Sequence, residues 1–271
     1  MTENDIAVVD WETLVTGFGD LGTGGTTPGY VFRGQSDASW PLEPKLHRSL
    51  ADGGRLNAPE PAGMLEHENA ATMKFKAAAP IQLPPAVLDS MNADIDWWPV
   101  MQHYGVPTRL LDWTESAYLG VYFASRASPG IDGALFFFHV PTLARQMKSI
   151  FGDDADLPTG ARNVKKAFAD PEAPHALYAV ERKTALPDRM LLQQSVFTVC
   201  RNVSGNHEAI LEEALSGLNT ASRRLFGKFV IQANQKRDFM RRLRSMNISA
   251  ESLFPGLDGI GLSIDESLRS R

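Results

Sequence analysis

The chain has 271 residues, a formal net charge of −5 at pH 7 and one cysteine, Cys200. That length can bury a complete hydrophobic core, so we expect one large domain, or one domain with helical attachments. The negative net charge excludes a protein that coats nucleic acid over its whole surface, although it permits a local basic patch. A single cysteine excludes an internal disulfide, and the six histidines lack the spacing of zinc ligands, so no metal site is expected.

The chain also lacks the sequence signals of secretion and of membrane insertion. Its first residues, MTENDIAVVDWE, are acidic, whereas a signal peptide begins with basic residues followed by an apolar stretch. The sequence has no run of about 18 apolar residues that could span a bilayer. We therefore expect a cytoplasmic protein without a membrane partner.

The first predicted strand covers residues 30–35 and carries an arginine in a buried setting. Residues 1–29 before it form an N-terminal extension that packs on the core. Alternation along the strand places Val31, Arg33 and Gln35 on one face. An arginine half-embedded in a sheet needs a partner, because an unpaired buried guanidinium is costly. Two partners stay open for Arg33, a carboxylate of the core and the phosphate of a bound ligand.

Two helices are predicted between this strand and the middle of the chain. Residues 64–78 have apolar side chains near helical spacing, and Glu66 and Glu68 lie in the first turns, where the helix dipole favours negative charge. A proline-rich break separates this helix from a second one over residues 86–98. The second helix leads the chain into its most distinctive stretch.

That stretch, residues 102–125, reads QHYGVPTRLLDWTESAYLGVYFAS and joins a loop rich in reactive side chains to a short helix. A glycine and a proline predict an irregular segment of fixed shape over residues 102–111. Either Asp112 or Thr114 caps the helix that follows. A loop with this many polar and aromatic side chains is richer in chemistry than a connection needs.

The helix after the loop carries a face of small side chains. Ala117, Gly120, Val121 and Ala124 fall at helical spacing on this face. Such a face lets another part of the backbone approach closely. We therefore expect tight packing against this helix.

Three side chains of the loop suit binding or acid–base chemistry. His103 and Asp112 are nine residues apart through a loop, which permits contact and a hydrolysis in which the histidine is the general base and no metal takes part. Arg109 lies three residues before Asp112, where its guanidinium can reach that carboxylate or an incoming phosphate. We expect Arg109 to clamp a ligand and Asp112 to fix the loop.

The second half of the chain supplies the remaining strands. Residues 133–141 form a continuous apolar run that ends in proline, which predicts a central strand covered on both faces. Residues 142–174 resemble an insertion, and further strands are predicted over residues 189–200 and 224–232. Together the elements predict an α+β fold with a mixed or antiparallel central sheet flanked by helices.

Polar residues mark the entry of the strand over residues 189–200. Gln193 and Ser195 share one face of this strand, and Gln194 lies on the other. Polar groups at the start of an apolar strand suit the rim of a binding site. We predict that Arg33, the loop over residues 103–113 and the start of this strand converge on one cleft.

A helix over residues 235–246 presents a basic stripe. Its apolar residues face inward at helical spacing, and its outer stripe consists of Arg237, Arg241 and Arg244. Such a stripe can contact phosphates, and a solvated surface is the alternative.

Four segments of the chain resemble the FRG-domain family. They are FRGQ at residues 32–35, QHYGVPTRLLDWT at residues 102–114, QSVFT at residues 194–198 and NISAESLFPGLDGI at residues 247–260. The resemblance covers residues 30–262, including the insertion at 142–174, and leaves residues 263–271 as a flexible tail. It implies an association with bacterial and phage conflict systems and with toxin-like proteins, whose partners include an antitoxin or a defence-system protein.

The sequence departs from the common pattern of that family at two positions. Tyr104 stands where a second histidine is frequent, and Ser195 stands where a glycine is frequent. The first change argues further against a metal held by a pair of histidines.

The order of elements also resembles ADP-ribosyltransferase-like folds, which implies a split sheet that binds NAD as a substrate. In such folds an arginine or a histidine holds the dinucleotide, and here Arg33 or His103 would do so. A tyrosine would stack on the nicotinamide, with Tyr104, Tyr118 and Tyr122 as candidates. The late strand offers Gln193 or Gln194 where that fold has a glutamate, so Glu66, Glu68 or Asp112 would have to supply the charge.

Three functions stay open: an ADP-ribosyltransferase-like or NAD-consuming toxin or phage-defence enzyme, a non-catalytic module that binds a nucleotide or nucleic acid, and a metal-independent hydrolase. No cofactor is expected, and the partners implied are a nucleotide and a protein or nucleic-acid target. The predicted catalytic residues are His103, Asp112 and Gln194. The predicted substrate-binding residues are Arg33, Gln35, Tyr104, Thr108, Arg109, Trp113 and Tyr122.

Overall fold

Seven strands form one sheet across the residues that the computed structural model describes, which are 5–8, 10–21, 29–52, 60–157, 161–180, 192–220 and 223–269. The strands are β1 (Asp5–Val8), β2 (Tyr30–Gln35), β3 (Leu111–Thr114), β4 (Gly133–His139), β5 (Leu177–Val180), β6 (Ser195–Cys200) and β7 (Phe226–Ile231). Their order is β1-β7-β4-β2-β3-β6-β5. Only β1 and β7 are parallel, so the sheet is mixed and the predicted α+β class is confirmed.

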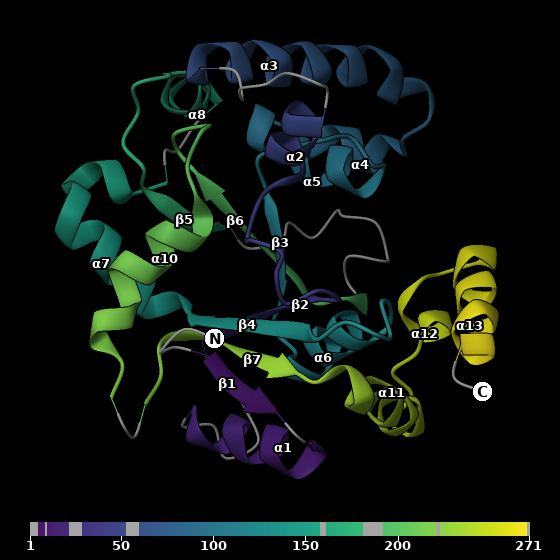
Figure 1. Cartoon of the computed structure of the whole chain (residues 1–271). Coiled ribbons are helices and arrows are strands. Elements are labelled where there is room, and N and C mark those ends of the chain that lie inside the picture. Colours follow the sequence, from purple (N-terminus) through teal and green to yellow (C-terminus); the bar gives the residue numbers. More distant parts are fainter. Residues whose placement is uncertain are drawn as a thin grey trace.

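Helices cover this sheet from several sides (Figure 1). They are α1 (Trp11–Asp20), α2 (Lys45–Asp52), α3 (Pro61–Ala78), α4 (Pro85–Asp89), α5 (Asp94–His103), α6 (Ala117–Ser125), α7 (Val140–Phe151), α8 (Ala161–Phe168), α10 (His207–Leu215), α11 (Lys236–Ser245), α12 (Ala250–Leu253) and α13 (Leu257–Arg269). None of the helices in the described residues is long and apolar enough to cross a membrane.

The apolar residues divide into clusters on different sides of the sheet. Helices α1, α6, α11 and α12 pack on one face, whereas α7 and α10 pack on the other. Helices α5 and α8 form a further cluster against β5 and β6. Strand β4 is buried along its whole length between β7 and β2, which confirms the predicted central strand.

Several local boundaries differ from those expected. Residues 111–114 form β3 instead of loop, so Asp112 cannot cap the next helix, and Ser116 does so by accepting a hydrogen bond from the amide of Leu119. The predicted insertion contains α7 and α8, which contribute buried residues to the core. Residues 263–269 continue α13 and are held by the buried side chain of Glu266, where a flexible tail was expected.

The sheet has a seam between β2 and β3. Strand β2 pairs with β4 at six consecutive positions, from Tyr30 to Gln35, but with β3 at one position only, Phe32 opposite Thr114. Beyond this pair the two strands exchange no further ladder hydrogen bonds. The seam therefore leaves backbone groups and side chains of both strands able to line a cavity.

Helix α6 touches β2 backbone to backbone beside this seam. A Cβ atom added at Gly34 would lie 1.9 Å from the carbonyl oxygen of Gly120 and 2.5 Å from the amide nitrogen of Ala124. A Cβ atom at Gly120 would lie 2.4 Å from a methyl carbon of Leu135. The predicted small-residue face of α6 is confirmed, because it accepts both β2 and β4 at distances that larger side chains forbid.

We expect Gly34→Ala to destabilise the protein by about 3 kcal/mol, the upper end of the usual cost of overpacking, because the added methyl group meets backbone atoms that cannot rotate away. The measurement is the free energy of unfolding in urea.

The matched control is Gly130→Ala, since a Cβ atom at Gly130 would meet nothing within 4 Å. That variant should unfold within about 0.5 kcal/mol of the original protein. Equal stability of the two variants would contradict the close approach of α6 to β2.

Candidate functional site

A cavity of about 240 Å³ opens at the seam between β2 and β3. It lies where β2, the end of α5, β3, α6 and the start of β6 meet. The residues that line it are Phe32, Arg33, Gly34, Pro99, Gln102, His103, Asp112, Trp113, Thr114, Phe123, Gln193 and Ser195. The predicted convergence of three distant polar segments on one cleft is confirmed.

Arg33 is the cation of this cavity, and its charge is only partly compensated. Its Nη1 donates a hydrogen bond of 2.9 Å across the seam to the carbonyl oxygen of Asp112, and the Asp112 carboxylate lies 3.9 Å away. Its Nε is buried and has no hydrogen-bond partner among the described residues. Burial lowers the pKa of the Arg33 guanidinium, and the nearby Asp112 carboxylate opposes that shift. Because arginine stays protonated in proteins, the result is a poorly solvated positive charge.

His103 and Asp112 line the cavity from different elements. His103 is the last residue of α5, and its ring packs edge-on against Tyr104 with the centroids 4.9 Å apart. Asp112 lies in β3, and 55% of its side chain is exposed. The cavity therefore joins an imidazole, an accessible carboxylate and a guanidinium, which are groups able to bind an anion and to move a proton.

Trp113 forms part of the cavity wall, and two successive buried hydrogen bonds fix its indole ring on the side away from the cavity. Its indole Nε1 donates to the hydroxyl of Thr198 at 2.9 Å, and that hydroxyl lies 3.0 Å from Nδ1 of His207. Since the indole can only donate, the Thr198 hydroxyl accepts from it, and a proton on either the hydroxyl or Nδ1 completes the second hydrogen bond. Burial, with smaller effects of His47, Arg33 and Arg109, lowers the pKa of His207 to about 3, so its ring stays neutral.

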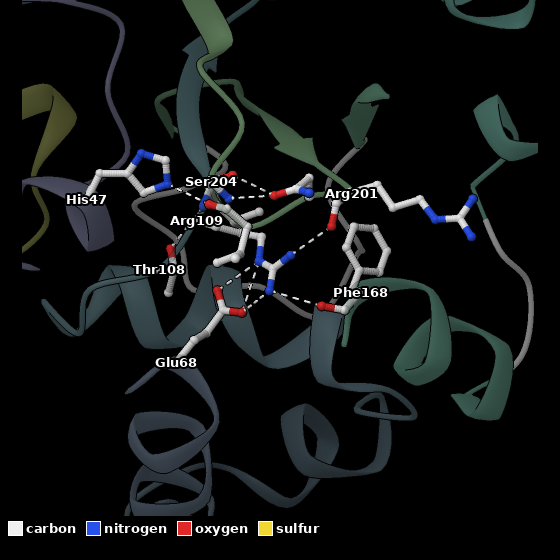
Figure 2. A network of polar contacts seen from close by, with 10 residues as sticks. His47, Glu68, Thr108, Arg109, Phe168, Arg201 and Ser204 are labelled. Atoms are coloured by element: carbon white, nitrogen blue, oxygen red, sulfur yellow. Dashed lines mark hydrogen bonds and ion pairs between the residues drawn. The ribbon is translucent and has the colours of Figure 1, made fainter. Parts of the chain in front are cut away.

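Arg109 lies outside this cavity, in the core, and Figure 2 shows its guanidinium beside Glu68 of α3 and Phe168 at the end of α8. Its Nε donates to both carboxylate oxygens of Glu68 at 3.0 and 2.9 Å, and its Nη2 also donates to Glu68. Nη1 donates to the carbonyl oxygen of Arg201 at 3.0 Å, and Nη2 to that of Phe168 at 3.1 Å. The side chain is 1% exposed. Arg109 was expected to clamp a ligand, but every nitrogen of its guanidinium already donates to the protein. Its role is therefore structural.

Other residues expected at the site also have places elsewhere. Tyr122 is fully buried and donates from its hydroxyl to Glu266 at 2.6 Å. Thr108 is buried and donates to the side chain of Gln102, and Gln35 donates to the carbonyl oxygen of Pro41. These three side chains make hydrogen bonds within the protein and do not line the cavity.

Two further candidates lie near the cavity without lining it. Tyr104 is 57% exposed beside His103. Gln194 has a positive φ of 48° and accepts the amide of Glu115 at its carbonyl oxygen, while the neighbouring Gln193 lines the cavity. Of the carboxylates considered, Glu68 is bound to Arg109 and Glu66 is exposed on α3, which leaves Asp112 in the cavity.

Phe123, Pro99 and Phe32 line the cavity although they were not proposed from the sequence. Phe123 lies on α6, away from the small-residue face, and is partly exposed. An aromatic residue outside that packing face was a usable sequence signal. Pro99 lies inside α5, where its missing amide can free a backbone carbonyl group. None of the three carries a reactive group, so all three shape the cavity.

One comparison with known proteins gives a match. Residues 28–130 match the family model described as FRG domain. This segment contains β2, α5, β3 and α6, and thus Arg33, His103 and Asp112, whereas Gln193 and Ser195 come from outside it. No curated protein and no solved structure matches the chain.

We expect Arg109→Ala to lower the free energy of unfolding by about 3–5 kcal/mol, because it leaves the buried Glu68 carboxylate without its partner. Arg109→Lys should also destabilise, since a lysine cannot reproduce the two-pronged contact. Urea unfolding measures both effects.

The double variant Glu68→Met/Arg109→Met is the control, because replacing both charges by apolar groups removes the unpaired charge and should recover much of the loss. An Arg109→Ala protein of normal stability would contradict the structural role.

Proposed function

The chain carries an FRG domain over residues 28–130, and we propose that the seam cavity of this domain binds a nucleotide, with Arg33 on a phosphate. NAD is the nucleotide that we propose as substrate. His103 and Asp112 would act on the bound molecule, and the family's association with conflict systems supports a toxin-like or defence role.

The observation that carries this proposal is the contrast between two arginines. Arg109 donates from all three of its nitrogens to acceptors of the protein. Among the described residues, Arg33 makes one hydrogen bond, to a neutral carbonyl group, and its Nε has no partner. The Asp112 carboxylate lies at the longer distance of 3.9 Å. A cation with unused donors on a cavity wall favours an anionic ligand, and the planar fork of arginine matches a phosphate group.

The size of the cavity limits how much of a ligand it can hold. Its volume of about 240 Å³ lies below the range of about 300–1,000 Å³ that is usual for small-molecule sites. We therefore propose that the cavity encloses one part of a dinucleotide, such as the nicotinamide riboside with its phosphate. The other part would lie outside the cavity.

The cavity holds the groups needed to break the N-glycosidic bond of such a ligand. The nicotinamide would leave with the bonding electron pair, and the Asp112 carboxylate would stabilise the positive charge that develops on the ribose. A water molecule would then attack the ribose C1′ and give its proton to His103 as general base. In a transferase, a hydroxyl group of a target molecule would take the place of water.

We expect Arg33→Ala to weaken nucleotide binding by about 1.5–3 kcal/mol, the usual contribution of a hydrogen bond to a charged group. Calorimetric titration with NAD, ADP-ribose and ATP measures the change, and urea unfolding measures the stability of the same variant.

The control for this variant is Arg145→Ala, which removes an arginine outside the cavity that donates to Thr142. It should leave nucleotide affinity unchanged. A large loss of stability in Arg33→Ala with unchanged affinity would mean that Arg33 is a core residue and that the phosphate site is absent.

We expect His103→Ala and Asp112→Asn to lower the rate of NAD consumption by about 100-fold or more, since general acid–base catalysis contributes about 10²–10⁴-fold. Both variants should bind NAD nearly as well as the original protein. Chromatography of the reaction products gives the rates.

The same assay separates an enzyme from a binding module. If the original protein binds NAD but consumes none of it, the alternative of a non-catalytic nucleotide-binding module replaces the enzyme. If both variants consume NAD at the original rate, His103 and Asp112 have no part in the chemistry.

A further inference from the structure

Helix α11 forms a second charged surface, separate from the seam cavity. We infer that the outer face of α11, with the hollow between it and the end of α6, binds the phosphate backbone of a nucleic acid without reading its sequence. This surface does not use the cavity or its residues, so the inference stands independently of the proposed function.

The register of α11 decides which side chains face outward. Phe239 and Leu243 are completely buried against the core. Arg237, Arg241 and Arg244 are exposed and recur at spacings of four and three residues, which places them on one side of the helix. At a rise of 1.5 Å per residue, they extend over about 10 Å of the helix axis.

The arginines border a hollow at the end of α6. The hollow has a volume of about 50 Å³ and is lined by Ser125, Arg126, Ala127, Pro129, Lys236, Arg237, Met240, Arg241, Arg244 and Glu266. Lys236 is buried and donates to three carbonyl oxygens, and Arg126 pairs with Glu266, so the exposed cations at the hollow are those of the stripe. Exposed cations that border a concave surface raise the local positive potential, even in a protein whose net charge is −5.

Two acidic side chains lie against this surface, and both are already paired. Glu266 is buried, accepts the hydroxyl of Tyr122 and pairs with Nε of Arg126 at 3.3 Å. Asp238 accepts from Arg241 at 2.9 Å and from Arg242 at 2.8 Å, so one carboxylate serves two guanidinium groups. Within α11, five basic residues (Lys236, Arg237, Arg241, Arg242 and Arg244) therefore stand against one acidic residue, Asp238.

Arg242 does not belong to the stripe. Its guanidinium lies over the ring of Trp11, 5.8 Å from the ring centroid, and so faces α1. The same helix thus carries an arginine that stabilises packing and three arginines that face solvent beside the hollow.

Three features favour a nucleic acid over other polyanions. The exposed cations are all arginines, whose planar fork binds phosphate through two parallel hydrogen bonds. The stripe of about 10 Å matches about three successive phosphates of one strand at about 3.4 Å each along the duplex axis. An anionic membrane is disfavoured, because a flat bilayer would also have to contact the neighbouring helix α13 with its exposed acidic residues Asp258 and Asp265, whereas one nucleic-acid strand needs to contact only the stripe.

The test is fluorescence anisotropy with labelled single-stranded and duplex DNA of about 16 nucleotides, which covers the usual site sizes, at several salt concentrations. The triple variant Arg237→Gln/Arg241→Gln/Arg244→Gln should lose at least tenfold in affinity. The slope of log K against log salt should fall by about 2–3, since each lost phosphate contact removes about 0.7–0.9.

The matched control is the triple variant Arg162→Gln/Lys165→Gln/Lys166→Gln. It removes the same charge from exposed positions of α8, at the opposite end of the molecule from α11 (Figure 1). Its affinity and salt slope should equal those of the original protein. Asp238→Asn should act in the reverse direction and strengthen binding, because it releases Arg241.

Several results would overturn the inference. They are no DNA binding by the original protein, equal losses in the two triple variants, and unchanged binding in the α11 variant. Binding of polyglutamate, or of vesicles that contain phosphatidylserine, as tightly as DNA and with the same loss in the α11 variant would also overturn it, in favour of an acidic protein or a membrane. Arg33→Ala should keep DNA binding, so failure here and failure of the nucleotide site can be told apart.

Discussion

Strand β2 and helix α6 touch backbone to backbone at Gly34 and Gly120, and the position of the cavity follows from this contact. A Cβ atom at Gly34 would come within 1.9 Å of the Gly120 carbonyl oxygen, so only glycine permits the approach. The contact fixes β2 directly against α6, which brings Phe123 to one side of the seam and leaves Arg33 to cross it toward Asp112. Without this close packing, the walls of the cavity would not have a fixed separation.

The hydrogen bonds of two arginines distinguish a structural arginine from a candidate for ligand binding. Arg109 is buried more completely, with 1% of its side chain exposed, and each nitrogen of its guanidinium donates to Glu68 or to a carbonyl group. In the part of the chain that the structure describes, Arg33 makes one hydrogen bond, lies 3.9 Å from the Asp112 carboxylate and keeps an unpaired Nε. A charged group that the fold positions but does not satisfy is a better candidate for binding an anion than one that is fully paired.

The sequence allowed the prediction of features that depend on local periodicity. The small-residue face of α6, the apolar strand β4 and the polar entry of β6 each show their pattern within about ten residues, the length of an ordinary element. The partner of Arg109 could not be found in this way, because Glu68 lies 41 residues earlier and only tertiary packing brings the two together. Strand β3 was missed because four residues are too short to show alternation beside a loop rich in polar side chains.

The central claim is that Arg33 is an incompletely paired cation that receives a phosphate. NMR spectra of the arginine Nε–H groups test it most directly, because the Nε of Arg109, bound to Glu68, serves as an internal reference in the same sample. On titration with ADP-ribose or NAD, the Arg33 Nε–H signal should shift and that of Arg109 should stay in place. An unchanged Arg33 signal at nucleotide concentrations that saturate calorimetric binding would contradict the account.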